Sequence, residues 1–152
     1  MIYLGVDPGK TTGIALVREN LDVWKLAEVK GGADGFLEYW NEFLEPWYKP
    51  DVIVCESFHT REGKHGVDTT PLVVIGALKA LADASGIPIL MQPPGGRLKR
   101  IPDAVMKRLD LYPPGRQNRN CREALRHVLS VMKSDGNRLV LEAFRDDETP
   151  QP

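Results

Sequence analysis

The 152-residue sequence predicts a single α/β domain with a mixed central β-sheet flanked by helices. Two observations support this. A strand meander opens the chain, and a short apolar strand followed by alternating helix and strand occupies the rest. A hydrophobic content of 42% without a run near the roughly 20 apolar residues of a membrane span favours a globular, non-membrane protein. We assign the domain to residues 1–145 and expect a disordered acidic tail over residues 146–152.

The N-terminal segment predicts a β-hairpin. Residues 1–4 and 14–17 are short and rich in Ile, Leu and Val, and the turn between them contains Pro8 and Gly9. A third strand is expected over residues 21–29. Because hairpin-connected strands pair with their neighbours, this part of the sheet should be antiparallel.

A helix and a central strand follow the meander. Residues 36–44 place aromatic and leucine side chains at helical spacing, and Pro46 and Pro50 end this pattern. The apolar run 52–55 is too short for a helix and is followed by Glu56, as expected of a buried strand that ends at a functional edge.

The second half of the chain alternates helix and strand. We expect a mobile loop over residues 59–70, a helix that begins at Pro71 and covers residues 71–84, and a strand over residues 87–91. A Pro/Gly-rich loop over residues 92–96 and two helices, over residues 103–109 and 120–133, should follow.

Cysteine usage and the N-terminus bear on the cellular compartment. Cys55 and Cys121 lack any CxxC or Cys/His spacing, which argues against a disulfide framework and a zinc site. Asp7 and Lys10 interrupt the N-terminus before an apolar secretory stretch can form. We therefore expect reduced thiols in a cytoplasmic protein.

The net charge of -1 conceals an uneven distribution of charge. Residues 97–138 contain 11 Lys/Arg against 4 Asp/Glu, a net charge of +7, whereas residues 1–96 contain 8 against 13, a net charge of -5. Such a basic segment attracts a phosphate backbone locally, over roughly 8–10 Å. A solvated surface is the alternative interpretation of the same charges.

The turn around Asp7 is the most specific local signal. Gly9, Lys10 and Thr11 resemble part of a phosphate-binding loop, but the glycine that this motif requires falls at Leu4, and a strand is expected to follow instead of a helix. We therefore expect no nucleotide cofactor. Two interpretations of Asp7 remain open: a catalytic carboxylate delivered to the sheet centre, or a local turn bond.

Two further carboxylates are candidates. Glu56 follows four residues of buried type, where a charge is costly unless paired or metal-bound, although the strand end could also reach solvent. In the last predicted helix, Asn120, Glu123 and His127 fall within about 60° of one another, opposite an apolar face. Alternatively, Asn120 and Glu123 form a capping box and His127 is simply exposed.

These three elements, in this order, resemble the RuvC family of Holliday junction resolvases, and the compact chain resembles its phage-encoded members. The resemblance implies an RNase H-like fold. The first motif comprises Asp7, Pro8, Gly9 and Gly13, the second spans residues 54–58, and the third spans residues 120–125. In the third motif, Glu123 replaces a family Asp, and Asn120 stands where the family has Asp or His.

The resemblance implies a structure-selective endonuclease that cleaves Holliday junctions or related branched DNA by two-metal-ion hydrolysis. It implies Mg²⁺ or Mn²⁺, two per active site, held by Asp7, Glu56, Asn120 and Glu123. Asp7, Glu56 and Glu123 would be catalytic, together with His127, which would orient a ligand or water or protonate the leaving group. In phage-encoded members, the site would act in a bacterial or phage-infected host cytoplasm.

Branched DNA and a second copy of the chain are the expected partners. The expected phosphate contacts are Lys10, Arg97, Lys99, Arg100, Lys107, Arg108, Arg116 and Arg119. Phe58 would either stack on an unpaired base or belong to the core. The helix over residues 71–84, with Gly76 and Ala77, would either form a homodimer interface or lie buried in the monomer.

Two other functions remain open from the sequence. The chain could be an RNase H-like nuclease that acts on other nucleic acid structures. It could also be a non-catalytic DNA-binding relative, in which Asn120, in place of the family's Asp or His, marks decay of the site.

Overall fold

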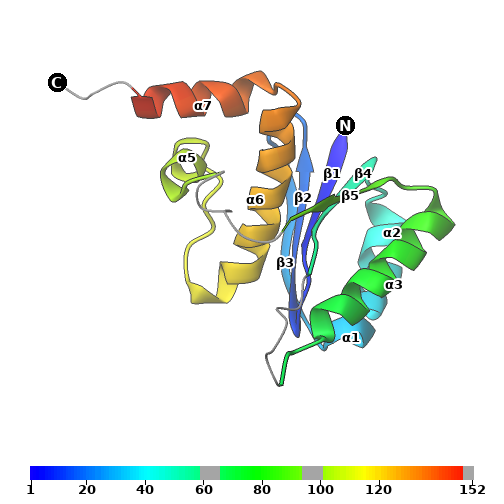
Figure 1. Ribbon diagram of the computed structural model, residues 1–152. Helices are drawn as coiled ribbons and strands as arrows, with labels where there is room; N and C mark the ends of the chain where they lie inside the picture. The colour runs from blue at the N-terminus through cyan, green and yellow to red at the C-terminus, as the bar shows by residue number, and fades with distance from the viewer. Residues whose placement is uncertain (59–65, 94–100, 149–152) are drawn as a thin grey trace.

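The computed structural model describes residues 1–58, 66–93 and 101–148. A five-stranded sheet with the strand order β3-β2-β1-β4-β5 forms its centre, and helices cover both faces (Figure 1). The strands are β1 (Ile2–Asp7), β2 (Thr11–Arg18), β3 (Val23–Lys30), β4 (Val52–Glu56) and β5 (Ile89–Gln92). The first three strands pair antiparallel, whereas β4 joins β1 and β5 joins β4 in parallel, which confirms the predicted mixed sheet.

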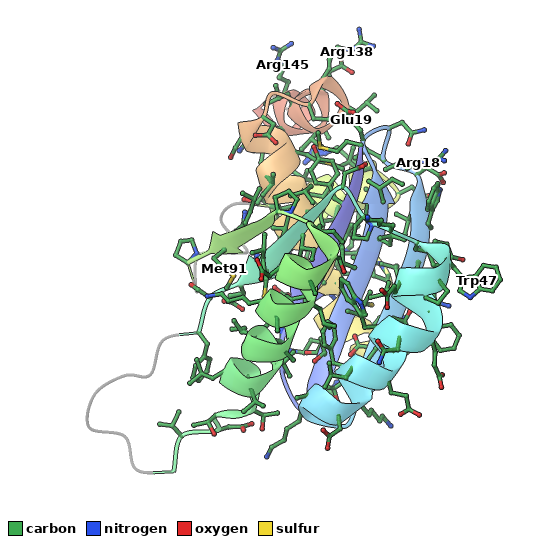
Figure 2. All side chains as sticks on the ribbon, turned by 90° about the vertical axis from the view of Figure 1, so that its right-hand side faces the viewer. Arg18, Glu19, Trp47, Met91, Arg138 and Arg145 are labelled. Carbon is green, nitrogen blue, oxygen red and sulfur yellow. The ribbon has the colours of Figure 1, made fainter. Side chains whose placement is uncertain are left out.

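One face of the sheet is covered by two helical segments. The first is a continuous run of α1 (Gly32–Tyr39), the π-helical turn η1 (Trp40–Leu44) and α2 (Glu45–Trp47), and the second is α3 (Thr70–Ser85). They lie side by side across this face, and Trp47 projects at its outer edge (Figure 2).

The helical run ends at Trp47, between Pro46 and Pro50 as predicted, although Pro46 itself lies within its last segment. The backbone changes from π to α geometry at Glu45, which places Pro46 in the first turn of α2. In a first turn, the missing N–H of proline costs no intrahelical hydrogen bond.

The other face is covered by the C-terminal elements. These are α5 (Asp103–Arg108), the 3₁₀ turn η2 (Arg116–Asn118), α6 (Arg119–Ser134) and α7 (Arg138–Glu148). Helix α7 is not predicted from the sequence, and its Val140 and Ala143 are buried in the same apolar core as the inner face of α6. The helix enters the segment expected to be a tail and ends at Glu148, and residues 149–152 lie outside the described part of the chain. In the described residues, no helix is long and apolar enough to cross a membrane.

Side chains alternate along the strands between two apolar layers. Tyr3 and Val54 belong to the layer against α6, whereas Leu4 belongs to the layer against α1 and α3. Since the side-chain period of a strand is two, Asp7 and Glu56 continue the first series and face α6.

Helix α6 lies against the sheet at two glycines. A Cβ on Gly5 would overlap the backbone carbonyl of Ala124, and a Cβ on Gly13 would overlap the backbone of Asn120. Close approach of two backbones is possible only where no side chain intervenes. Gly5 and Gly13 therefore set the height of α6 above β1 and β2.

Gly13→Ala should destabilise the protein by about 1–3 kcal/mol, because the added methyl group forces α6 away from the sheet. Gly76→Ala is the matched control, since a Cβ there meets no atom within 4 Å in the described structure and Gly76 lies within α3. That substitution should stabilise by about 0.5–1 kcal/mol. Urea unfolding measures both, and equal midpoints for Gly13→Ala and the wild type would contradict the close approach.

Candidate metal centre

Strand register brings three polar side chains to one edge of the sheet. Val6 pairs with Cys55 in parallel, so Asp7 and Glu56, each one residue further, end neighbouring strands. Glu56 in turn pairs with Gln92 at the end of β5. The carboxyl ends of parallel strands meet at one edge, where α/β folds commonly place their ligands.

Helix α6 adds an imidazole to the two carboxylates. Asp7, Glu56 and His127 each offer a ligand atom, and these atoms all lie within 4.8 Å of one another. His127 is 2% exposed and Glu56 is 7% exposed, whereas Asp7 is half-buried. The group is therefore closed on the core side and open to solvent at Asp7.

The orientation of His127 leaves one ring nitrogen directed at the carboxylates. Its Nδ1 lies 2.8 Å from Oε1 of Gln92, and its Nε2 lies 3.8 Å from Oε2 of Glu56. The second distance exceeds a hydrogen bond, and within the described residues Nε2 is buried with no hydrogen-bond partner.

These residues fit a divalent cation. Two carboxylates packed together in a largely buried site repel each other unless a positive charge compensates them. A hydrogen bond to the second ring nitrogen is the usual support of a metal-bound imidazole. Burial raises the pKa of the Cys55 thiol to about 12, the carboxylates of Asp7 and Glu56 add to that rise, and Lys79 opposes it.

Glu123 precedes His127 by about one turn of α6 but takes no part in the group of three ligand atoms. Its Oε1 accepts a hydrogen bond from Nη1 of Arg126 at 2.9 Å. Arg126 is 3% exposed, pairs also with Asp103, and donates through Nε to the carbonyl of Ile101. The guanidinium therefore ties Glu123 to the start of α5.

The Asn120 side chain is bound to Glu28 on β3. Its Nδ2 donates to Oε2 of Glu28 at 2.8 Å, and the backbone N–H of Cys121 donates to the other oxygen at 2.8 Å. The capping-box alternative is wrong, because α6 begins at Arg119 and the Asn120 side chain binds Glu28 on β3 instead of the helix backbone. Burial, followed by the nearby Glu28 carboxylate, raises the pKa of the Cys121 thiol to about 11.

The turn after Asp7 is closed by a threonine. The Thr12 hydroxyl, fully buried, donates to the carbonyl of Gly9 and accepts from its N–H. The strand β2 follows directly, as predicted, where a phosphate-binding loop would require a helix. Lys10 at the tip of the turn is exposed, and its Nζ lies 3.7 Å from Asp68.

The remaining predicted DNA contacts divide into described and undescribed residues. Lys107, Arg108, Arg116 and Arg119 are exposed on α5, η2 and the start of α6. Arg97, Lys99 and Arg100 lie outside the described residues. Phe58 is half-buried and packs against the apolar layer formed with α1 and α3, which supports the core interpretation.

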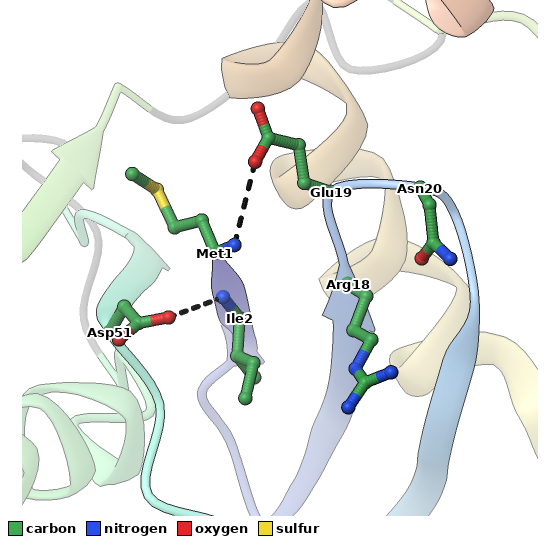
Figure 3. Close-up of a pocket in the computed structure, with 6 residues that line it drawn as sticks. All are labelled: Met1, Ile2, Arg18, Glu19, Asn20 and Asp51. Atoms are coloured by element: carbon green, nitrogen blue, oxygen red, sulfur yellow. Dashed lines mark hydrogen bonds and ion pairs between the residues drawn. The ribbon is translucent and has the colours of Figure 1, made fainter.

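A cavity of about 400 Å³ lies at the opposite end of β1 from Asp7. There Glu19 pairs with the N-terminal amine of Met1, and Asp51 accepts from the N–H of Ile2 (Figure 3). Since these acidic groups already have partners within the chain, the cavity offers no comparable set of ligand atoms.

Sequence reasoning missed three polar residues that organise the site: Glu28, Gln92 and Arg126. Gln92 carries the same signal as Glu56, because it is a polar residue directly after a short apolar strand. Glu28 and Arg126 gave no such signal, since their partners lie on elements distant in the sequence.

The sequence matches no protein-family model, and no curated protein matches it. Solved structures do resemble it. RuvC of Thermus thermophilus, in complex with a Holliday junction substrate, is 16% identical over 100% of this chain and 99% of that chain, with a TM-score of 0.65. The fowlpox virus resolvase, in complex with Holliday junction DNA, is 18% identical over 87% and 99%, with a TM-score of 0.59.

The yeast mitochondrial Holliday junction resolvase Ydc2 is 16% identical over 95% of this chain and 82% of that chain, with a TM-score of 0.51. These likenesses extend over nearly the whole chain and include the mixed sheet that carries Asp7 and Glu56. The protein therefore has the RNase H-like fold of the RuvC-type Holliday junction resolvases.

Proposed function

We propose that the protein is a metal-dependent DNA endonuclease that cleaves Holliday junctions or related branched DNA. The observation that carries this proposal is the convergence of Asp7, Glu56 and His127 at one sheet edge. Support comes from the fold, since the similar solved structures are junction resolvases and two of them contain junction DNA.

Mg²⁺ or Mn²⁺ is the proposed ion, because both favour the oxygen ligands that Asp7 and Glu56 supply and tolerate one imidazole. When bound, such an ion makes a coordinated water more acidic and neutralises charge on the scissile phosphate. His127 would hold the ion through Nε2, a role for which the sequence analysis had nominated Asn120.

The chain's own groups determine how substrate reaches the site. Glu56 and His127 are buried, so water and the scissile phosphate approach from the half-buried Asp7. Exclusion of water on the core side strengthens the attraction between the carboxylates and a cation. Asp7 and Glu56 would therefore hold a cation where the phosphate approaches, and its charge would offset the repulsion between the two carboxylates and the phosphate.

A second ion, which the RuvC resemblance implies, would draw on Glu123. Participation would require Glu123 to share its carboxylate between the ion and Arg126, whose Nη1 it already engages. The buried Arg126 would then hold Glu123 at the correct height on α6 and limit its movement.

The DNA contacts are proposed to come from the exposed basic residues Lys107, Arg108, Arg116 and Arg119. Arg119 begins the helix that carries His127. Contacts of this type bind the phosphate backbone and position the substrate without reading its sequence.

We also propose that the protein acts as a homodimer through α3. One side of this helix is buried in the core, and the other exposes the apolar residues Leu72 and Val73 and the small residue Ala80. Exposed apolar and small residues at helical spacing permit close packing of two copies, and two sites are needed to cut opposing strands.

Asp7→Asn and Glu56→Gln should each reduce cleavage of a labelled four-way junction by more than about 100-fold. Removing only a residue that supports a metal ligand commonly costs up to about 100-fold in activity, and removing the ligand itself should cost more. Junction binding should be retained, because the phosphate contacts come from other residues. Glu42→Gln, an exposed carboxylate on η1, is the control.

Thermal unfolding gives a second readout of the same variants. Mn²⁺ at about 100 times its Kd should stabilise the wild type by about 2.7 kcal/mol, and Asp7→Asn should lose this gain. Retained cutting by either variant would refute the assignment. Flaps, forks and RNA–DNA hybrids in the same assay test action on other nucleic acid structures, and binding without any cleavage would identify a non-catalytic protein.

Asn120→Asp should destabilise the protein by about 1.5–3 kcal/mol, because it replaces a donor to the Glu28 carboxylate with a second carboxylate. Glu28→Gln combined with Asn120→Asp should recover most of this loss, since the amide and carboxylate then exchange positions. Urea unfolding of the double-mutant cycle measures the coupling. If Asn120→Asp instead tightened Mn²⁺ binding, Asn120 would be a ligand as the sequence analysis proposed.

Val73→Glu should convert a dimer into a monomer in light scattering, because it places a charge in the centre of the exposed apolar strip on α3. Leu139→Glu, an exposed apolar position on α7 on the other face of the molecule, should leave the mass unchanged. A wild-type protein that has monomer mass and still resolves junctions symmetrically would exclude the dimer.

A further inference from the structure

We propose that Gln92 is a positioning residue that fixes the tautomer of His127 and thereby directs the Nε2 lone pair at the carboxylates of Asp7 and Glu56. The proposal rests on the proposed function, since it assigns a role within the same metal centre.

The hydrogen bond between the two side chains defines the tautomer. Oε1 of Gln92 lies 2.8 Å from Nδ1 of His127, and a carbonyl oxygen only accepts, so Nδ1 carries the proton. A neutral imidazole has one N–H, and Nε2 therefore carries a lone pair. This is the form in which a histidine binds a metal through Nε2.

The surroundings of Nε2 agree with this assignment. A protonated Nε2 beside a carboxylate would approach it to hydrogen-bond distance, but Nε2 lies 3.8 Å from Oε2 of Glu56. The atom is buried and has no hydrogen-bond partner within the described residues. The lone pair of this buried nitrogen therefore faces the side on which Asp7 and Glu56 would hold a cation.

Gln92 is itself held in place by the strand that carries Glu56. The two residues are partners in the parallel register of β4 and β5. The carbonyl of Gln92 also accepts from the backbone N–H of Ser57 at 2.7 Å and from its hydroxyl at 2.9 Å. These bonds tie the backbone of Gln92 to the end of β4. The Gln92 side chain therefore orients His127 relative to Glu56.

The first experiment reads the tautomer directly in the metal-free protein. Nitrogen-15 NMR of the imidazoles distinguishes a protonated Nδ1 from a protonated Nε2, and comparison with His127→Asn assigns the signal among the three histidines. The wild type should show Nδ1–H, and Gln92→Met, which removes the acceptor at similar volume, should lose this preference. A wild-type signal from Nε2–H would overturn the proposal, because Gln92 would then donate through its NH₂ group.

The second experiment measures Mn²⁺ affinity by calorimetry. Gln92→Met should weaken binding by about 10–100-fold, the usual loss when the group behind a metal-bound histidine is removed. Gln92→Glu keeps an acceptor at the same position and should restore binding to near the wild-type value. Gln117→Met makes the same chemical change at an exposed position and should have no effect.

The two readouts separate this proposal from the proposed function. Wild-type behaviour of Gln92→Met in both measurements would overturn the role of Gln92. Nδ1–H in the wild type and its loss in Gln92→Met would support that role even if no Mn²⁺ bound, and the absence of Mn²⁺ binding would then refute the metal-dependent mechanism alone.

Discussion

The close approach of α6 to the strands β1 and β2 is the contact on which the rest of the site depends. Gly5 and Gly13 leave no side chain between the helix and the sheet, so the backbones of Ala124 and Asn120 lie directly against the strands. At this height, His127 offers a ligand atom within 4.8 Å of those of Asp7 and Glu56, at the ends of β1 and β4. Gly5 and Gly13, near the start of the sequence, therefore allow the close packing of α6 that brings His127 to the carboxylates.

The same contact explains why polar groups gather around α6. Glu28 accepts from the backbone of Cys121 and from Asn120, which fixes the first turn of the helix to β3. Arg126, buried one residue before His127, fixes the next turns to α5 through Asp103 and Ile101. Because packing alone permits a helix to slide or rotate slightly, these directional bonds specify its position more narrowly.

Glu56 and His127 lie almost free of solvent beside Asp7, and burial of charged groups is unfavourable for folding unless they are paired or bind a cation. Such an arrangement is typical of a site whose geometry serves binding more than stability. Gln92 belongs to the same arrangement, since its side-chain amide bonds to the His127 imidazole while its backbone carbonyl accepts from Ser57. The polar groups of the site therefore form a connected set that spans β4, β5 and α6.

The amino-acid sequence by itself predicts the strand meander, the central strand and Asp7 and Glu56 as candidate ligands, because period-two patterns and a charge after an apolar strand are local signals. It did not determine which residues of α6 face these carboxylates. Asn120, Glu123 and His127 share one side of the helix, and a rotation of a few tens of degrees decides among them. That rotation is set by Gly5, Gly13, Glu28 and Arg126, whose contacts join residues from 25 to 119 positions apart and so exist only in the folded chain.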